Sequence, residues 1–329
     1  MTNRDDGRLR ELLAAIGGQR VLVVGDLYLD RYIFGQPSRI SREAPIMVLN
    51  EDRQEDRLGG GAAPALALTE LGCDVAVAGV VGDDSEGTCV VELLHRSGID
   101  TVGVVVDASR PTTAKIRVVA EGFFLFPQQI VRVDRQERAP APDAVERRLC
   151  DVIQQANADA VLVSDYRSGV VTEQVVTAIR DSVSDKPRLK TVDSQGELTK
   201  FSGFDLVKCN QGEAEQVLGH PLGDRSHREE SLPVLRRQIG CGALVVTRGG
   251  DGASIVTDDG YAEISSSNRS EVYDVTGAGD TVVAVMTAAM LAGGSAVEAA
   301  MLAQVAAGVV VRKWGNAQAT RDEIASALS

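Results

Sequence analysis

The feature that most constrains the fold is a repeated alternation of short aliphatic runs and segments with helical periodicity. From residue 74 onward, the aliphatic runs lie at about 75–81, 160–164, 189–192, 206–208 and 244–247. The helical segments lie at about 85–97, 143–156, 172–183, 211–218 and 228–239. Strands that alternate with helices in this way join through right-handed crossovers into a parallel sheet. We therefore expect an α/β fold with a doubly wound, mostly parallel sheet and helices on both of its faces.

Two segments, at about 27–58 and 112–135, depart from this alternation. They carry many charges, alternate polar and apolar residues in places, and have no helical period of useful length. Strands of this kind have one face in water, so we expect short strands that form a small β flap, or lid, beside the main sheet. No internal repeat or low-complexity linker divides the chain, and residues 1–329 are predicted to form a single domain with this flap. Because unpaired strand edges tend to be covered, the flap also predicts a homodimer.

The composition limits the partners. A net charge of −13 disfavours nucleic acid, since binding to a phosphate backbone relies on clustered Lys and Arg. The five cysteines are scattered without a CxxC pair, which is typical of a cytoplasmic protein with reduced thiols and no structural zinc site. The first residues are too charged for a signal peptide. The apolar region 281–311 is interrupted by Gly293, Gly294 and Glu298, and therefore predicts two buried helices and no membrane span.

Residues 277–280, Gly-Ala-Gly-Asp, follow β-like stretches at 261–264 and 270–273 and open a helix of small residues. Backbone N–H groups at such a helix start have no carbonyl partner and can hold an anion. A carboxylate beside an anion is hard to explain unless Asp280 handles a proton or a metal there. A plain helix start is the other interpretation.

Three glycines, Gly59, Gly60 and Gly61, precede a helix at 65–71 and permit either close approach of a ligand or a tight turn.

Polar residues follow several of the expected strands. They are Asp26, Asp165, Tyr166, Asp193, Asn210, Glu213, Thr247, Arg248 and Gly249. Each alone is explained equally well as a turn or cap residue. Together they predict a polar cleft, because ligands bind at the carboxyl edge of an open α/β sheet. Acidic groups and a glycine-rich anion cradle, without a Cys or His cluster, favour magnesium-assisted phosphoryl transfer over hydrolysis by a Ser/His pair.

The stretch Asp274-Val275-Thr276-Gly277-Ala278-Gly279-Asp280 resembles the C-terminal signature of the ribokinase-like (PfkB) sugar kinases. Asn210-Gln211-Gly212-Glu213 resembles the NxxE motif of that family. The likeness extends over essentially the whole chain and keeps the order of the family's motifs. Within the family, the chain is most similar to the D-glycero-β-D-manno-heptose 7-phosphate kinases. The matching segments lie within 25–32, 38–45, 115–118, 129–134, 164–169, 272–282 and 306–311.

This resemblance implies a ribokinase-like fold and ATP-dependent phosphorylation of a sugar hydroxyl, here the anomeric hydroxyl of a heptose 7-phosphate. It implies that Asp280 accepts the hydroxyl proton, while the N–H groups of Gly277, Ala278 and Gly279 stabilise the transferring phosphoryl group. It also implies Mg²⁺, organised by Asn210 and Glu213 through water and the triphosphate.

The binding residues are implied in the same way. For the sugar phosphate they are Asp26, Gly59, Gly60, Gly61, Lys115, Arg117, Arg132 and Asp165. For ATP they are Asn210, Thr247, Arg248, Gly249, Gly252, Thr276, Gln304 and Ala307.

Three positions depart from the heptose kinase pattern. Pro64 and Gln304 each stand where those kinases have Asn, and Gln195 replaces the lysine of an Asp-Pro-Lys-Gly segment. A proline side chain cannot bond a sugar hydroxyl, and Gln195 removes a cation from the cleft. The acceptor could therefore be another sugar phosphate, a sugar or a nucleoside, and a non-catalytic relative that binds sugar or nucleotide is a further alternative.

Overall fold

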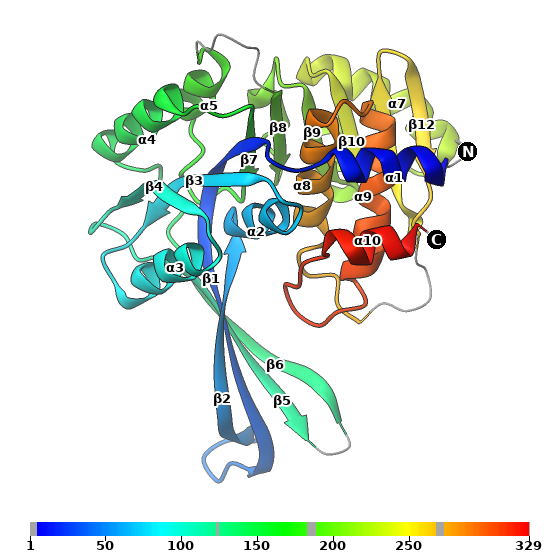
Figure 1. Ribbon diagram of the computed structural model, residues 1–329. Coiled ribbons are helices and arrows are strands. Elements are labelled where there is room, and N and C mark those ends of the chain that lie inside the picture. Colours follow the sequence, from blue (N-terminus) through cyan, green and yellow to red (C-terminus); the bar gives the residue numbers. More distant parts are fainter. Residues whose placement is uncertain (1–4, 123–124, 183–188, 268–272, 329) are drawn as a thin grey trace.

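The computed structural model describes residues 5–122, 125–182, 189–267 and 273–328, and its helices cover a central sheet (Figure 1). The α-helices are α1 (Asp6–Ala15), α2 (Ala62–Glu70), α3 (Ser85–Arg96), α4 (Asp143–Gln155), α5 (Glu173–Arg180), α6 (Gln211–Leu218), α7 (Arg225–Ile239), α8 (Ala278–Leu291), α9 (Ala296–Val310) and α10 (Arg321–Ala327). The strands are β1 (Arg20–Ile40), β2 (Met47–Gly60), β3 (Asp74–Val81), β4 (Asp100–Val106), β5 (Thr113–Gly122), β6 (Leu125–Arg135), β7 (Ala160–Asp165), β8 (Leu189–Ser194), β9 (Leu206–Asn210), β10 (Ala243–Thr247), β11 (Ala253–Thr257) and β12 (Gly260–Ile264). Two 3-10 turns, η1 (Leu198–Phe201) and η2 (Gly249–Asp251), complete the elements of these residues.

The central sheet has the strand order β12-β11-β10-β9-β8-β7-β1-β3-β4. The strands from β10 to β4 pair in parallel, and β11 and β12 add an antiparallel hairpin at one edge. The expected doubly wound, mostly parallel sheet is confirmed. Parallel neighbours send their carboxyl ends to the same edge, so the polar strand-end residues are brought to one side of the molecule.

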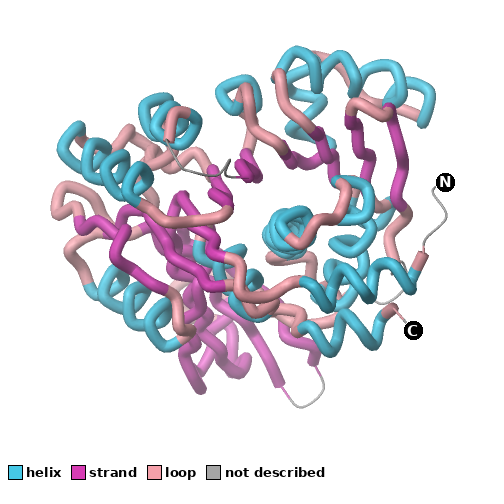
Figure 2. The backbone as a smooth tube through the Cα atoms, turned by 45° about the horizontal axis from the view of Figure 1, so that its top comes forward, coloured by secondary structure: helices cyan, strands magenta, loops and turns pink. Residues whose placement is uncertain are grey.

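Both faces of the sheet are covered, as Figure 2 shows. The first half of β1 explains how, because successive side chains on a strand point to opposite faces. Val21 and Val23 belong to a core formed with α1, α2, α8, α9 and α10. Leu22 and Val24 belong to a second core formed with α4, α5 and α7. A strand buried on both faces therefore needs an uninterrupted aliphatic run.

The flap consists of β2, the second half of β1, β5 and β6, and it projects from the body as a long twisted ribbon (Figure 1). Its position agrees with the predicted segments, but the expectation of short strands was wrong. β1 is 21 residues long in total and runs from the central sheet into the flap. β2 is 14 residues long. Near Asp26 to Tyr28, β1 exchanges its neighbours β3 and β7 for β2 and β5. An exchange of neighbours leaves the backbone extended, so no turn signal marks it in the sequence.

Two strands, β4 and β11, were not predicted. In β4 the interspersed Asp100, Thr101 and Gly103 hide the apolar run.

The two buried helices predicted between 281 and 311 are α8 and α9. Among the described helices, none combines the length and apolar character needed to cross a bilayer. Parts of two predictions, the strand at 270–272 and the last residue of the helix at 172–183, lie outside the described residues.

Candidate active site

Asp280 lies in the first turn of α8 at the carboxyl edge of the sheet. Its side chain is only 8% exposed. The phenol of Tyr166, just after β7, donates to both carboxylate oxygens of Asp280 at 3.1 Å. Burial and the nearby Asp193 raise the pKa of Asp280 from 3.8 to about 7, against the opposing influence of Lys208 and the Tyr166 hydrogen bond. A carboxyl with this pKa can exchange a proton near neutral pH, which is the property required of a general base.

The loop before α8 is held by Asp274. Its Oδ1 accepts from the backbone N–H and the hydroxyl of Thr276, at 2.9 and 2.7 Å, and its Oδ2 accepts from the Gly315 N–H at 3.0 Å. Gly277 has φ +79°, and a Cβ there would collide with the side chain of Asn316. Only glycine fits this left-handed, crowded position. The glycine of the signature thus fixes how the backbone enters the helix.

The start of α8 has no side-chain cap. The Ala278 N–H donates to the Val275 carbonyl at 3.2 Å, so it is already engaged in the loop. A Cβ on Gly279 would lie 2.8 Å from Nζ of Lys208. The absent side chain at Gly279 therefore brings the helix N-terminus and an ammonium group together, and both attract anions.

Lys208 was not predicted as a site residue. It lies on β9, two residues before Asn210, and is 5% exposed. Its Nζ donates to Oδ2 of Asp193 at 2.6 Å. Burial alone would lower the pKa of Lys208, but attraction to Asp193 and the hydrogen bond between them outweigh it, so the pKa is raised and the side chain stays charged. A lysine in an otherwise aliphatic strand is the signal in the sequence that could have identified it.

A cavity of about 440 Å³ opens beside this charge pair. Its lining includes most of the predicted nucleotide residues, namely Asn210, Thr247, Gly249, Gly252, Gln304 and Ala307. It also includes Ala278, Gly279 and Lys208, so the cavity reaches the start of α8. Apolar Val275, Val282 and Val311, which were not predicted, provide walls of the kind that pack against a flat ring. The cavity thus joins an apolar compartment to a cationic end.

Two predicted nucleotide residues do not line this cavity. The guanidinium of Arg248 donates to the Ala253 carbonyl at 3.4 Å and lies 3.9 Å from Glu263. The Thr276 hydroxyl is bonded to Asp274. Both residues take part in loop structure.

Asn210 and Glu213 form a capping box at the start of α6. Asn210 Oδ1 accepts from the Glu213 N–H at 3.0 Å, and Glu213 Oε2 accepts from the Asn210 N–H at 2.7 Å. Burial raises the pKa of Glu213. Oxygen donors are the ligands that Mg²⁺ prefers. Within the described part of the chain, no group of three or more His, Cys, Asp or Glu side chains could enclose a metal. The residues present suit an ion that keeps most of its water.

Asp26 lies across the sheet edge from α8 and is 1% exposed. Its carboxylate accepts from the backbone N–H groups of Tyr166, Ser168 and Val170, at 2.8, 3.1 and 3.4 Å. Burial raises its pKa to about 6, although these hydrogen bonds counteract the shift. Asp26 therefore fixes the loop after β7, and its assignment to the sugar stays a prediction.

The three glycines join the end of β2 to α2 beside Asp26. The Gly61 N–H donates to the Asp26 carbonyl at 2.7 Å. Gly59 packs against the Asp30 carboxylate, and Gly60 has φ +56°. Pro64 is buried in the first turn of α2, where its missing N–H breaks no helical hydrogen bond. The glycines therefore let β2 return close to β1 at the base of the flap.

The predicted cations of the flap differ in their surroundings. Arg117 is buried and donates to Asp30 at 2.7 Å. Lys115 lies over the rings of Tyr28 and Tyr166, 4.4 and 5.1 Å from their centroids, and burial lowers its pKa. Arg132 is exposed and makes a two-pronged ion pair with Asp134 on its own strand. Lys115 and Arg117 thus lie at the base of the flap and face the site, whereas Arg132 is drawn to Asp134.

Asp165, the last predicted sugar ligand, is almost fully buried. It forms an ion pair with Lys200 at 2.8 Å and accepts a hydrogen bond from the Ser194 hydroxyl at 3.0 Å. These contacts attach the end of β7 to β8 and to η1.

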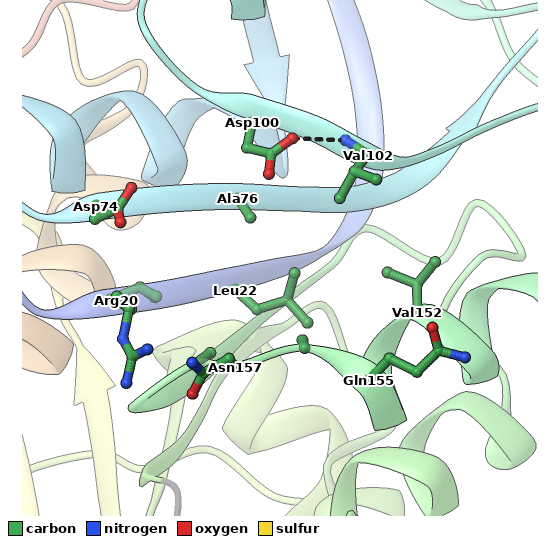
Figure 3. Close-up of a pocket in the computed structure, with 12 residues that line it drawn as sticks. Arg20, Leu22, Asp74, Ala76, Asp100, Val102, Val152, Gln155 and Asn157 are labelled. Carbon is green, nitrogen blue, oxygen red and sulfur yellow. Dashed lines mark hydrogen bonds between the residues drawn. The ribbon is translucent and has the colours of Figure 1, made fainter.

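A separate cavity of about 430 Å³ lies at the opposite, amino edge of the sheet (Figure 3). Arg20, Asp74 and Asp100 from the starts of β1, β3 and β4 line it, together with the end of α4. None of the predicted site residues is among its lining residues. The polar strand ends therefore converge at one edge, away from this cavity.

Comparisons with known proteins identify the family of the chain. Residues 19–322 match the model of the pfkB family of carbohydrate kinases. The Bifunctional protein HldE of Trichlorobacter lovleyi is 37% identical over 313 residues, which are 94% of this chain and 63% of that protein. The Bifunctional protein HldE of Helicobacter pylori is 37% identical over 314 residues, 94% of this chain and 66% of that protein. The chain thus spans about two thirds of the length of these relatives.

Solved structures show the same fold at lower identity. Escherichia coli phosphofructokinase-2 in complex with fructose-6-phosphate has a TM-score of 0.77 at 18% identity, covering 95% of this chain and 98% of that one. Arabidopsis thaliana ribokinase complexed with ribose and ATP has a TM-score of 0.70 at 19% identity, covering 95% and 99%. The ribokinase-like fold is confirmed, and the chain belongs to the pfkB family of carbohydrate kinases.

Proposed function

We propose that this chain transfers the γ-phosphoryl group of ATP to the anomeric hydroxyl of a heptose 7-phosphate. One observation carries the phosphoryl transfer: the buried Asp280 carboxyl, with its pKa raised to about 7, lies at a glycine-rich helix start beside the Lys208 ammonium. A proton acceptor and an anion-binding group are thereby adjacent. The choice of heptose rests on the HldE relatives and on the motif resemblance.

In this proposal ATP occupies the cavity beside α8, with its phosphates toward Lys208 and Gly279. Bound ATP would supply the phosphoryl group, and Mg²⁺ would neutralise its charge. Asn210 and Glu213 would hold the ion through water. Asp280 accepts the sugar hydroxyl proton late in the reaction, because the transition state of phosphoryl transfer is loose. Lys208 stabilises charge on the transferring group, and it also supplies a cation to the cleft where Gln195 does not.

The sugar phosphate would lie between Asp280 and the base of the flap. Lys115 and Arg117 are cations at the base of the flap. Lys115 has no hydrogen-bonded carboxylate among the described side chains, so it is the better placed of the two to bind a phosphate. Arg132 could join only by leaving Asp134.

The quaternary structure and location are part of the same proposal. Ile130, Val131 and Val133 on β6, an outer strand of the flap, are 44%, 48% and 54% exposed. Apolar side chains along an outer strand favour coverage by a second copy, so we propose a homodimer through the flap. An ATP-dependent enzyme whose five cysteines are free would work in the cytoplasm.

The test is ADP release with a panel of acceptors, with the product identified by phosphorus NMR. Heptose 7-phosphate should be the best substrate and should gain a phosphate at the anomeric carbon. Turnover of fructose 6-phosphate, ribose or a nucleoside in its place would contradict the heptose assignment. Binding of ATP and sugars without ADP from any acceptor would favour the non-catalytic alternative.

A further inference from the structure

Tyr166 connects the two buried carboxylates on either side of the site. Its backbone N–H donates to Oδ2 of Asp26 at 2.8 Å. Its phenol donates to both oxygens of Asp280 at 3.1 Å. Tyr166 therefore links the loop after β7, through Asp26, to the Asp280 side chain on α8.

The backbone around Tyr166 is held in place. Arg167 has φ +60°, a left-handed conformation that is uncommon for a residue with a side chain. This turn allows the N–H groups of both Tyr166 and Ser168 to reach Asp26. The ring of Tyr166 also packs against Tyr28, with centroids 5.2 Å apart. The backbone bonds to Asp26 and the packing against Tyr28 therefore hold the ring so that its phenol points at Asp280.

The charged groups around Asp280 and Tyr166 come from four strands. Asp193 on β8 and Asp30 on β1 disfavour its ionised form, whereas Lys208 on β9 favours it. Lys115 on β5 lies against the Tyr166 ring. Burial, Asp280 and Asp193 raise the pKa of the phenol well above its usual value, so Tyr166 keeps its proton and acts as a donor.

We propose that Tyr166 is a positioning residue for the transfer step: its phenol orients the Asp280 carboxylate and stays bonded to one oxygen while the other receives the acceptor proton. A carboxylate has about four lone-pair sites, so the phenol and a sugar hydroxyl can both be bound. The present contact, equal to both oxygens, becomes a bond to one of them when the sugar arrives. This inference rests on the proposed role of Asp280 as the base.

The experiment is the pH dependence of kcat/KM in Tyr166→Phe. Without the phenol the ionised carboxylate loses a donor, so the acidic limb should move upward by about one pH unit, the shift expected for one hydrogen bond to a charged group. At pH 7 the rate should fall roughly tenfold, since less of the base is ionised and its plane is no longer fixed. KM for ATP should not change, because Tyr166 does not line the nucleotide cavity.

The matched control is Tyr28→Phe. The ring of Tyr28 packs against that of Tyr166 in a tilted arrangement, but the Tyr28 phenol is bonded to Ser168 and not to Asp280. Its acidic limb should stay at the wild-type position. Equal shifts in both variants, or no shift in Tyr166→Phe, would overturn the proposal. A rise in ATP hydrolysis without sugar in Tyr166→Phe would also overturn it, because the phenol would then be excluding water instead of orienting the base.

A readout that needs no substrate separates this proposal from the proposed function. Carbon NMR of aspartate labelled at the carboxyl carbon follows Asp280 directly, and its resonance is the one lost in Asp280→Asn. A higher midpoint in Tyr166→Phe than in the wild-type protein supports the contact even if no acceptor is phosphorylated. An unchanged midpoint rejects it even if the chain is an active kinase.

Discussion

Asp26 and Asp280 are both buried carboxyls at the carboxyl edge of the sheet, yet their surroundings differ. Asp26 accepts from three backbone N–H groups, and its pKa is raised to about 6. Asp280 accepts from one phenol beside another acid, and its pKa is raised to about 7. The backbone donors use the lone pairs of Asp26 to hold the loop in place. Asp280 still has lone pairs that can accept a hydrogen bond from a ligand. Burial alone therefore does not distinguish the two acids. The kind of donor does, and it supports our proposal that Asp280 is the reactive one.

The largest expected effect is that of Asp280→Asn on turnover. Removal of the proton acceptor should lower kcat by a factor on the order of 10³, while ATP is still bound. The measurement is ADP release together with ATP affinity by calorimetry. Turnover at the wild-type rate would show that another group accepts the proton.

The same variant should be more stable than the wild-type protein at high pH. Burial raises the pKa of Asp280 above its unfolded value of 3.8, so ionisation of this group destabilises the folded state. The penalty is absent below about pH 4 and grows as the pH rises toward 7, reaching at most on the order of 4 kcal/mol. Denaturant unfolding of both proteins at pH 5 and pH 8 checks the sign. A variant that is less stable at pH 8 would contradict it.

Lys208→Met should have the next largest effect. It removes the cation beside Gly279 and leaves Asp193 buried without its partner, so kcat should fall by roughly 10 to 10³-fold, the range for loss of one group that stabilises transition-state charge. Lys190→Met, on the neighbouring strand β8 but near its amino end, is the control and should remain active. Similar losses in both variants would point to a general effect of lysine removal.

The pH profile of the wild-type protein tests the Asp280 side of the comparison directly. Because the base must be ionised, kcat/KM should fall about tenfold per unit as the pH drops below about 7. A limb near pH 4 would mean that the carboxyl is not buried in the working enzyme.

Asp26→Asn tests the other carboxyl. An amide would present an N–H group or one fewer lone pair to three backbone donors, and an unsatisfied buried donor costs about 1–3 kcal/mol. We expect a loss of stability of that size near pH 4. At pH 8 the loss should be smaller, because the amide also removes the cost of ionising a buried acid whose pKa is raised to about 6, as Asp280→Asn does for its own acid. A purely kinetic defect, with unchanged unfolding, would assign Asp26 to the sugar instead of the loop.

The sequence predicted the fold and the general place of the site for a physical reason. Buried parallel strands need aliphatic runs, and their carboxyl ends must meet at one edge, so Asp280 and Asn210 could be placed from local patterns. The ion pairs between strands could not be predicted from the sequence. Lys208 with Asp193 and Arg117 with Asp30 join residues 15 and 87 positions apart. Such pairs depend on side-chain directions that no local pattern records.

Gln195→Lys has the smallest predicted effect. The substitution restores the lysine of the heptose kinase pattern, but Gln195 is exposed and Lys208 already places a charge at Asp193. The added cation would lie in solvent, where its interactions are screened. Turnover should therefore change by no more than about twofold in Gln195→Lys, whereas in a Lys208→Met background the same substitution should recover part of the lost rate if the two positions serve one charge. Turnover is measured by ADP release. Equal effects in both backgrounds would show that positions 195 and 208 act independently, so that Lys208 does not replace the lysine missing at position 195.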